Sequence, residues 1–280
     1  MTAKNKICIG IVTFNPDIND IETTLRNIGN SFHVIIVDNG SNNIDSIQKI
    51  SHSYDCHIIT NNENLGIAKA LNQIFEFADK NSYEWVLTLD DDSLPPSNMI
   101  SSFLSMLKGR DNVGIICPML ISKGNHSIFH SKTAVDECIT SGSLTNVEAW
   151  KSIGGFDEWL FIDSVDFDFS KRLHKAGYVI LEDRNVLLPH EIGKTKTINL
   201  LVAHPAIRNH SAFRKYYQER NYIYVDYKLH QYSYFIDLLR FMKHVLFVVL
   251  WEEDKFEKIQ SMIRGRKDGL NKIRELKKEY

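Results

Sequence analysis

Three consecutive carboxylates, Asp90, Asp91 and Asp92, have the types and spacing that most directly indicate chemistry in this chain. They follow the apolar run 85–89, which is typical of a buried strand, and two prolines soon end the segment. Ligands bind outside the carboxyl ends of strands in open α/β sheets. Because adjacent carboxylates repel one another, a hard cation such as Mg²⁺ or Mn²⁺ would offset that cost and bridge to substrate phosphates. A solvated acidic loop is the alternative, but the strand and the prolines favour a binding site.

Two other turns carry polar side chains suited to a nucleotide or a sugar. Asp38 follows the strand-like run 34–37, and its carboxylate could accept hydrogen bonds from a ribose or a base edge. An Asx or type I′ turn over 38–41 explains the same residues equally well. Residues 64–66 open a helical pattern whose free N–H groups could face a phosphate, with simple N-capping as the more ordinary explanation.

The second half of the chain holds a candidate base. Asp166 and Asp168 alternate with apolar residues, and an apolar wall raises the pKa of a carboxylate and makes it a better base. Alternatively, one of the two caps the following helix, which reaches Arg172, and we expect the two residues to divide these roles. His190 ends the last strand-like run; a lone histidine is usually structural, but histidine is also a frequent metal ligand.

Composition limits the class of protein. A chain of 280 residues can form one large domain or a domain with an appendage, and its net charge of −2 argues against nucleic acid as a partner. The four cysteines lie far apart without a CxxC pair, which indicates a reducing compartment and no zinc site. The first residues do not resemble a signal peptide, and no run reaches the ~20 apolar residues of a membrane-spanning helix. We therefore expect a cytoplasmic protein.

Strand-like and helical runs alternate along the first half, which predicts an α/β fold with a Rossmann-like, mostly parallel sheet flanked by helices. Strands are expected at 7–14, 34–37, 57–60, 85–90, 114–118, 139–144 and 177–181, and helices at 17–30, 44–50, 67–78, 147–152 and 167–176. From about residue 211 the pattern is helical, so we expect a catalytic domain over 1–210 and a helical, basic extension over 211–280. No GxGxxG follows the first strand, which argues against a dinucleotide cofactor, and no GxxxxGK[ST] occurs, which excludes a P-loop enzyme.

Five segments resemble, in order, those of family 2 glycosyltransferases with a GT-A fold; they are 13–15, 37–41, 64–66, 89–92 and 154–158. Residues 161–166 and 220–221 are similar to the rhamnosyltransferase branch in particular, and Val165 stands where many other members carry Glu. The resemblance spans about 7–225. It implies an inverting transferase with a nucleotide-sugar half at about 1–115 and an acceptor half at about 116–210.

The resemblance also implies a role for each matching residue. Asp166 would be the general base, Asp92 and His190 would contact Mg²⁺ or Mn²⁺, and Asp163 and Trp159 would lie on the acceptor side. Contacts to the nucleotide-diphosphate sugar would come from Thr13, Asn15, Asp38, Asn64, Gly66, Lys69, Asp90, Asp91 and Arg220.

We therefore expect transfer of L-rhamnose from dTDP-rhamnose to a hydroxyl of a lipid-linked or oligosaccharide acceptor in bacterial surface polysaccharide synthesis. UDP-galactose, UDP-galactofuranose and UDP-glucose are alternative donors, and a non-catalytic sugar-nucleotide binding protein is an alternative class. A haloacid-dehalogenase-like phosphatase also places DxD after a strand, but it needs Thr or Val where Leu94 stands.

The C-terminal region carries an apolar stripe and a basic excess. The stripe has helical spacing and consists of Phe235, Leu238, Leu239, Met242, Leu246, Val249 and Leu250. Residues 255–280 hold nine Lys and Arg against four Asp and Glu. This combination suits the anionic inner face of a cell membrane. A helix packed on the catalytic domain, or on a second subunit in a homodimer, is an equal alternative.

Overall fold

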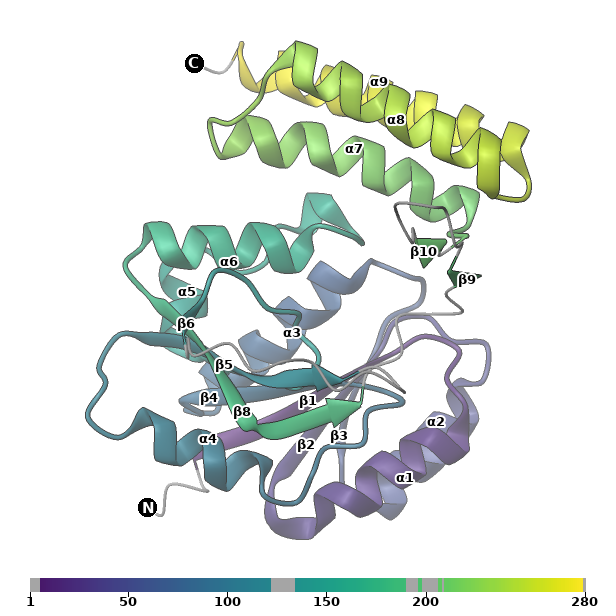
Figure 1. Ribbon diagram of the computed structural model, residues 1–280. Coiled ribbons are helices and arrows are strands. Elements are labelled where there is room, and N and C mark those ends of the chain that lie inside the picture. The colour runs from purple at the N-terminus through teal and green to yellow at the C-terminus, as the bar shows by residue number, and fades with distance from the viewer. Residues whose placement is uncertain (1–5, 122–133, 190–195, 198–205, 208, 279–280) are drawn as a thin grey trace. The chain divides into compact units, whose positions relative to one another are not determined.

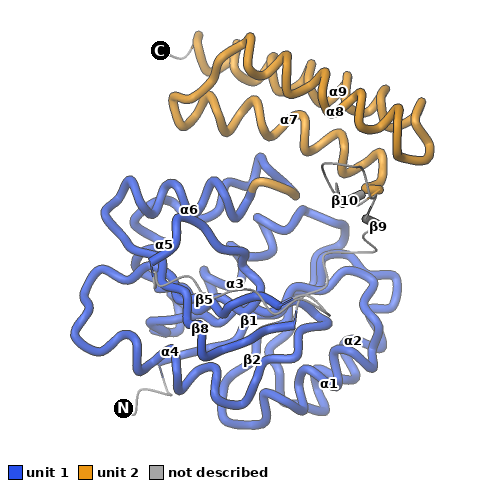
Figure 2. Tube along the Cα trace, in the orientation of Figure 1, with its two compact units in different colours: residues 1–161, 165–190 blue, residues 162–164, 191–280 orange. Residues whose placement is uncertain are grey.

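The computed structural model describes residues 6–121, 134–189, 196–197, 206–207 and 209–278 (Figure 1). The chain divides into two compact units (Figure 2). Unit 1 comprises residues 1–161 and 165–190, and unit 2 comprises residues 162–164 and 191–280. The chain thus leaves unit 1 for three residues and returns to it at Val165, one residue before Asp166.

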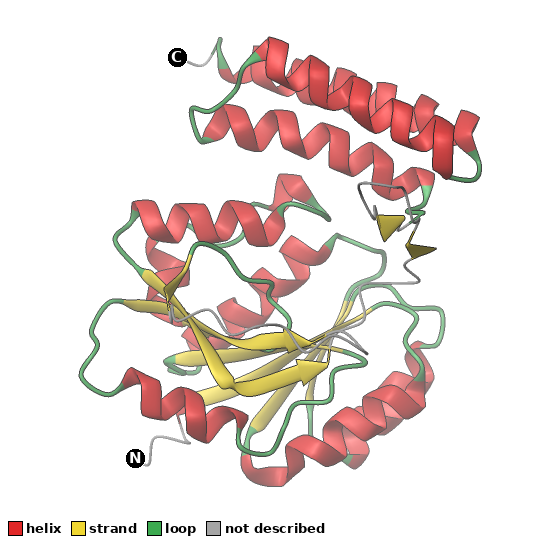
Figure 3. Cartoon of the chain, viewed as in Figure 1, coloured by secondary structure: helices red, strands yellow, loops and turns green. Residues whose placement is uncertain are grey.

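Unit 1 is built on a sheet whose described strands have the order β3-β2-β1-β4-β7-β5-β8-β6. Figure 3 shows the strands in yellow between red helices. The strands are β1 (Ile7–Thr13), β2 (His33–Asp38), β3 (His57–Thr60), β4 (Trp85–Asp90), β5 (Val113–Ile121), β6 (Ala134–Val135), β7 (Ser143–Asn146) and β8 (Val179–Pro189). β1 to β4 are mutually parallel, and β5 is parallel to β8. β7 runs antiparallel between β4 and β5. Because β1, β2 and β4 are parallel, their polar carboxyl ends share one edge of the sheet.

Helices cover both faces of this sheet (Figure 1). On one side lie α1 (Ile18–Ile28), α2 (Ile44–Ser53) and α4 (Met99–Leu107), and on the other lie α3 (Ile67–Lys80), α5 (Val147–Ser152) and α6 (Val165–Lys175). Short 3₁₀ turns occur at η2 (Gly29–Ser31) and η3 (Glu158–Leu160). α1 begins where the Asp17 carboxylate accepts a hydrogen bond from the Asn19 N–H at 2.8 Å. Its residues Ile21 and Leu25 are buried against the sheet, as their spacing predicts.

Most predicted elements of unit 1 are confirmed, and two corrections stand out. The strand predicted at 139–144 begins only at Ser143, because Gly142 turns the chain with a φ of +75° and donates to the Thr88 carbonyl at 2.7 Å. The second correction is α4, which the sequence analysis did not predict. Its Met99 and Phe103 are buried in the core soon after the two prolines.

The described part of unit 2 contains the helices α7 (Ala212–Lys228), α8 (Tyr234–Trp251) and α9 (Lys255–Leu276), and the short strands β9 (Lys196–Thr197) and β10 (Ala206–Ile207). α7 and α9 pack closely because α9 has glycine at the contact. A Cβ on Gly265 would lie 2.1 Å from the Tyr216 carbonyl oxygen, and one on Gly269 would lie 2.7 Å from that of Arg220. The basic segment 255–280 is therefore mostly a packed helix. Within the described ranges, no helix is both long and apolar enough to cross a membrane.

Candidate active site

The acidic residues form a tight turn at the end of β4. The Asp90 N–H donates to Ser93 Oγ at 3.0 Å, and the Ser93 N–H donates to the Asp90 carbonyl at 3.1 Å. Thr24 of α1 donates from its hydroxyl to the Ser93 carbonyl at 2.8 Å, which ties this turn to the scaffold. Asp90 and Asp91 are half-buried, whereas Asp92 is exposed. The turn thus presents several carboxylates at one edge of the sheet.

Crowding of these carboxylates has an electrostatic consequence. Burial, followed by the charges of Asp92 and Asp90, raises the pKa of Asp91 to about 6. A bound cation would act in the opposite direction and favour the ionised form. In the part of the chain that the structure describes, no three His, Cys, Asp or Glu side chains are already grouped to hold a metal. The predicted ligand His190 lies outside the described residues, so its pairing with Asp92 stays a prediction.

Thr140 connects the candidate base to the acidic turn. Its backbone N–H donates to Asp166 Oδ1 at 3.3 Å. Its carbonyl accepts a hydrogen bond from the hydroxyl of Thr88, which lies on β4 two residues before Asp90. The next residue, Ser141, is hydrogen-bonded to Ser93 through their hydroxyls at 3.1 Å. These contacts therefore link Asp166 to β4, the strand that ends at the acidic turn.

Asp166 and Asp168 differ in their surroundings. Both lie in the first turn of α6, and Asp166 is partly exposed. Asp168 is fully buried and pairs with Arg172 at 2.7 Å, while Arg172 also donates to the Ile153 carbonyl at 2.9 Å. The expected helix-capping role is wrong for Asp168, since its carboxylate binds a side chain one turn onward. Asp168 is a structural ion-pair partner, whereas Asp166 lies at the surface of the site.

Asp38 is engaged by its own turn. Thr13 donates to Asp38 Oδ1 at 3.1 Å, and the N–H groups of Gly40 and Ser41 donate to Oδ2 at 3.2 and 3.0 Å. The carboxylate is 1% exposed. The structure therefore shows the Asx-turn alternative, in which Asp38 shapes the loop between β2 and α2. A contact of Asp38 with a nucleotide stays a prediction.

Amide side chains join the loops that follow β1, β2 and β3. Asn15 Oδ1 accepts from the Asn42 N–H at 2.8 Å, and Asn39 donates to Asn64 Oδ1 at 3.0 Å. Asn64 Oδ1 also accepts from the Gly66 N–H at 2.9 Å, which is a local turn contact at the start of α3. Asn15 and Asn64, both predicted to bind the donor, thus hold the loop edge of the sheet in shape.

Gly66 is required by a close approach. Its φ is +87°, and an added Cβ would lie 2.7 Å from the Phe161 ring. The Ile67 N–H donates to the Phe161 carbonyl at 2.7 Å. This N–H group, predicted to face a phosphate, is therefore occupied by protein. Gly66 instead joins the start of α3 to the residue that precedes segment 162–164.

Lys69 and Asn72 of α3 hold the segment 154–158. Lys69 Nζ lies 3.0 Å from Glu158 Oε1, and Asn72 donates to the same oxygen at 3.0 Å. Asn72 also accepts from the Phe156 N–H at 2.8 Å. Lys69, which was predicted to contact the nucleotide-sugar, thus forms an ion pair with Glu158 at the surface. Trp159, which was predicted to lie on the sugar-acceptor side, is half-buried in the adjoining turn η3, where its backbone N–H donates to Asp157 Oδ1.

The remaining predicted residues belong to unit 2. Asp163 accepts from Arg214 Nε at 3.2 Å, and Asn221 donates to the carbonyl oxygens of Ile162 and Asp163 at 2.7 and 2.9 Å. Arg220 is 9% exposed and stacks over the Tyr217 ring at 4.5 Å. α7 therefore holds segment 162–164, in which Asp163 and Ser164 have φ values of +61° and +63°.

Sequence reasoning missed three polar residues that position the site. Asn72, Thr140 and Arg214 make the contacts above, and none lies in a recognised segment. Asn72 had a detectable signal, because it is a buried polar residue in an amphipathic helix. Thr140 acts through its backbone and carries no signal in its residue type.

A mixed sheet with helices on both faces and an acidic turn after a central strand defines a GT-A glycosyltransferase fold. Residues 8–162 match the model of glycosyl transferase family 2. The chain belongs to this family and is a glycosyltransferase. It is similar to the dTDP-rhamnosyl transferase RfbF of Shigella flexneri, with 25% identity over 290 residues that cover 94% of this chain and 95% of the relative.

Solved structures share the fold at low sequence identity. The mannosyltransferase PcManGT from Pyrobaculum calidifontis, in complex with GDP-Man and Mn²⁺, matches with a TM-score of 0.60 and 13% identity over 95% of this chain and 73% of its own. TarS of S. aureus in complex with UDP-GlcNAc matches with a TM-score of 0.57 and 12% identity over 92% and 70%. GalNAc-T7 with UDP, GalNAc and Mn²⁺ matches at 0.61 and 12% over 79% and 47%. These matches confirm the predicted fold class.

Proposed function

We propose that this enzyme transfers L-rhamnose from dTDP-rhamnose, with inversion, to a hydroxyl of a lipid-linked or oligosaccharide acceptor. The reaction would serve assembly of a bacterial surface polysaccharide at the inner face of the cell membrane. Two findings support the donor and the chemistry. The similarity to a dTDP-rhamnosyl transferase extends over nearly the whole of both chains. The observation that supports the mechanism is the pair of Thr140 contacts, which link the Asp166 carboxylate to Thr88 of β4, the strand that ends at Asp90.

The carboxylate oxygens of the acidic turn are suitable ligands for a divalent metal. Carboxylate oxygens are the ligands of Mg²⁺ and Mn²⁺, and such sites use one or two carboxylates together with substrate phosphates. Asp92 is exposed at the turn and would hold the metal together with His190. Two fold neighbours were solved with Mn²⁺, one of them with GDP-Man and the other with UDP. The metal would supply neutralisation of negative charge on the leaving diphosphate.

Asp166 is the group that would act on the acceptor. As the bond to the diphosphate breaks, positive charge develops on the sugar ring, and an acceptor hydroxyl attacks from the opposite face. The Asp166 carboxylate would take the hydroxyl proton in the same step, and the single displacement inverts the anomeric centre. The backbone N–H of Thr140 orients this carboxylate. Asp163 and Trp159 would lie on the acceptor side, as the family resemblance implies.

Turnover of a donor panel tests the proposed donor. We would incubate the enzyme with Mn²⁺ and dTDP-rhamnose, UDP-glucose, UDP-galactose or UDP-galactofuranose, and measure release of the nucleoside diphosphate. The proposal expects dTDP-rhamnose to give a kcat/KM at least tenfold above the others. Preference for a UDP-sugar would mean that the proposed donor is wrong, while the proposed type of reaction would stand. Donor binding without turnover, with saturating acceptors, would indicate a non-catalytic binding protein.

Metal dependence is tested on the acidic turn itself. Asp92→Ala should abolish the Mn²⁺-dependent part of donor binding and nearly all transfer, since it removes the exposed carboxylate. Glu257→Gln removes an exposed carboxylate of unit 2 and is the control. Calorimetry with and without Mn²⁺ measures donor affinity. Full activity in excess EDTA would contradict the metal assignment.

A further inference from the structure

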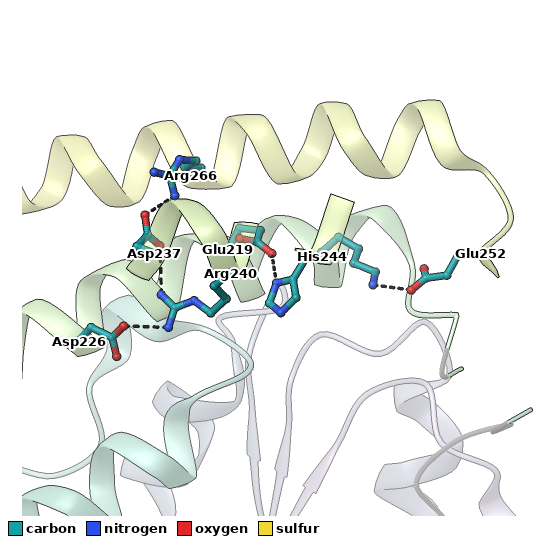
Figure 4. Close-up of polar contacts among 8 residues, drawn as sticks. Glu219, Asp226, Asp237, Arg240, His244, Glu252 and Arg266 are labelled. Atoms are coloured by element: carbon teal, nitrogen blue, oxygen red, sulfur yellow. Dashed lines mark hydrogen bonds and ion pairs between the residues drawn. The ribbon is translucent and has the colours of Figure 1, made fainter. Parts of the chain in front are cut away.

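Helix α8 places its ionisable residues inward. Asp237, Arg240 and His244 are spaced by three and four positions, so they share one face. Asp237 is 2% exposed and pairs with Arg240 at 3.1 Å and with Arg266 of α9 (Figure 4). Arg240 also pairs with Asp226 of α7 at 2.8 Å. The face of α8 that meets α7 and α9 is therefore largely a network of charges.

The same pattern continues toward the end of α8. His244 Nδ1 lies 2.6 Å from Glu219 Oε1 of α7, and the Glu219 side chain is only 3% exposed (Figure 4). Directly after α8, Glu252 pairs with Lys215 at 2.6 Å and with Lys258 at 3.0 Å. Burying a charge is costly unless it is paired. These contacts specify which side of α8 faces inward.

The opposite side of α8 is apolar and uncovered. Its side chains Phe235, Leu239, Met242, Leu246, Val249 and Leu250 are between 43% and 68% exposed. On a helical wheel they fall within an arc of about 100°. Lys243 is the exposed ionisable residue of α8, and no carboxylate of α8 is exposed. A water-facing helix normally has the reverse arrangement, so this face fits an apolar environment.

Charge favours a lipid surface over a second copy of the chain. Residues 211–280 contain 15 Lys and Arg against 10 Asp and Glu, a net charge of +5, whereas the whole chain carries −2 and the remainder therefore −7. Several acids of this region are internally paired, as Glu219, Asp237 and Glu252 show. Two such regions brought together would repel, while an anionic surface would attract each of them.

We propose that the exposed face of α8 inserts into the headgroup region of an anionic phospholipid bilayer. The six apolar side chains would replace contact with water by contact with acyl chains, and the exposed Lys243 would lie near the phosphates. The buried ion pairs of Figure 4 keep this face outward before binding. The inference holds for any donor sugar, so it stands apart from the proposed reaction.

Vesicle sedimentation of the full chain tests the inference. The vesicles are phosphatidylcholine alone, or phosphatidylcholine with one third phosphatidylglycerol. The wild type should bind the anionic vesicles at least tenfold more tightly, and the binding should weaken as salt rises. Leu239→Glu with Leu246→Glu should reduce that binding at least tenfold, because both side chains are exposed in the stripe. Gln231→Glu with Gln260→Glu adds the same charge at exposed positions outside the stripe and should reduce binding far less.

Each outcome has a defined meaning. Unchanged melting temperature and donor turnover in both double variants show that the fold and the reaction are intact. Equal vesicle binding by the wild type and the stripe variant would overturn the inference. A wild type that ignores both vesicles would also overturn it. If that wild type is a dimer in sedimentation velocity and the stripe variant is a monomer, the face belongs to a second copy of the chain.

Discussion

Helices α3 and α8 have opposite arrangements of polar and apolar residues. α3 buries Ala70, Leu71, Ile74 and Phe75 against the sheet of unit 1, with one buried amide, Asn72. α8 buries Asp237 within unit 2 and leaves Leu239 and Leu246 exposed. Unit 1 thus has a largely apolar core, with the buried Asp168–Arg172 pair as an exception, while unit 2 has several ion pairs in its interior. Apolar burial alone stabilises many arrangements, whereas paired charges select one orientation.

The comparison predicts where a lost charge affects function and where it affects folding. Acids of the candidate site that are partly or fully exposed, such as Asp91 and Asp166, should be needed for catalysis and should contribute little to stability. Acids in an interior, in either unit, should be needed for folding. Four substitutions test this division, in order of expected effect.

Asp166→Asn should have the largest effect, and it should be on rate alone. A general base contributes about 10²–10⁴-fold, so we expect kcat to fall at least about a hundredfold. Donor affinity should change little because the base acts on the acceptor. Stopped assays with saturating acceptor, and donor calorimetry, measure the two quantities. Loss of donor affinity with an unchanged saturated rate would place Asp166 in the donor site.

Asp168→Asn should instead affect folding. The substitution leaves Arg172 without an ionised partner at the fully buried side chain of residue 168. Breaking a buried ion pair typically lowers the free energy of unfolding by about 3–5 kcal/mol. Urea unfolding at a temperature where both proteins fold measures the free energy of unfolding. Asp166→Asn is the matched control at a partly exposed position of the same helix turn. A stable Asp168→Asn protein with the lower kcat of the two would show that Asp168 is the base.

Glu252→Gln should destabilise the interior of unit 2. The carboxylate is 2% exposed between Lys215 and Lys258, so the neutral amide leaves two cations poorly compensated, at a cost of about 3 kcal/mol. Loss of helical circular dichroism on heating reports this change. Glu257→Gln, at an exposed position of α9, should melt like the wild type. Equal melting of both variants would mean that the ion pairs do not stabilise unit 2.

Asp91→Asn should have the smallest effect, and its sign depends on pH. The folded pKa of Asp91 is about 6, above the usual ~3.9 of an unfolded aspartate, so the native state binds the extra proton. Its contribution to stability is present below about pH 4 and is lost as pH rises through about 6. Without metal at pH 7.5, the substitution should therefore raise the free energy of unfolding by on the order of 1 kcal/mol after solvent screening, and the melting temperature should rise with it. At pH 4 the two proteins should melt alike; a lower melting temperature at pH 7.5 would contradict the crowding of the turn.

The sequence determined most elements of unit 1, though not α4, and the order of the motifs on them. Runs such as 34–37 and 85–90 became β2 and β4, because their continuous apolar pattern is stable only inside a covered sheet. The helical region after Ser211 was predicted as well, and Ser211 caps α7 through its side chain. Local patterns suffice here because each depends on neighbours within one turn of helix or along one strand.

Tertiary structure decided the arrangement of the site and the orientation of α8. The backbone of Thr140 joins Asp166 to β4 across gaps of 26 and 52 residues, and no residue type announces such a contact. The C-terminal stripe was visible in the sequence, but a stripe normally marks the buried side of a helix. Only Glu219, Asp226 and Arg266, brought in from other helices, turned the charged face of α8 inward. Buried charges are stable only beside partners, and those partners are set by the fold.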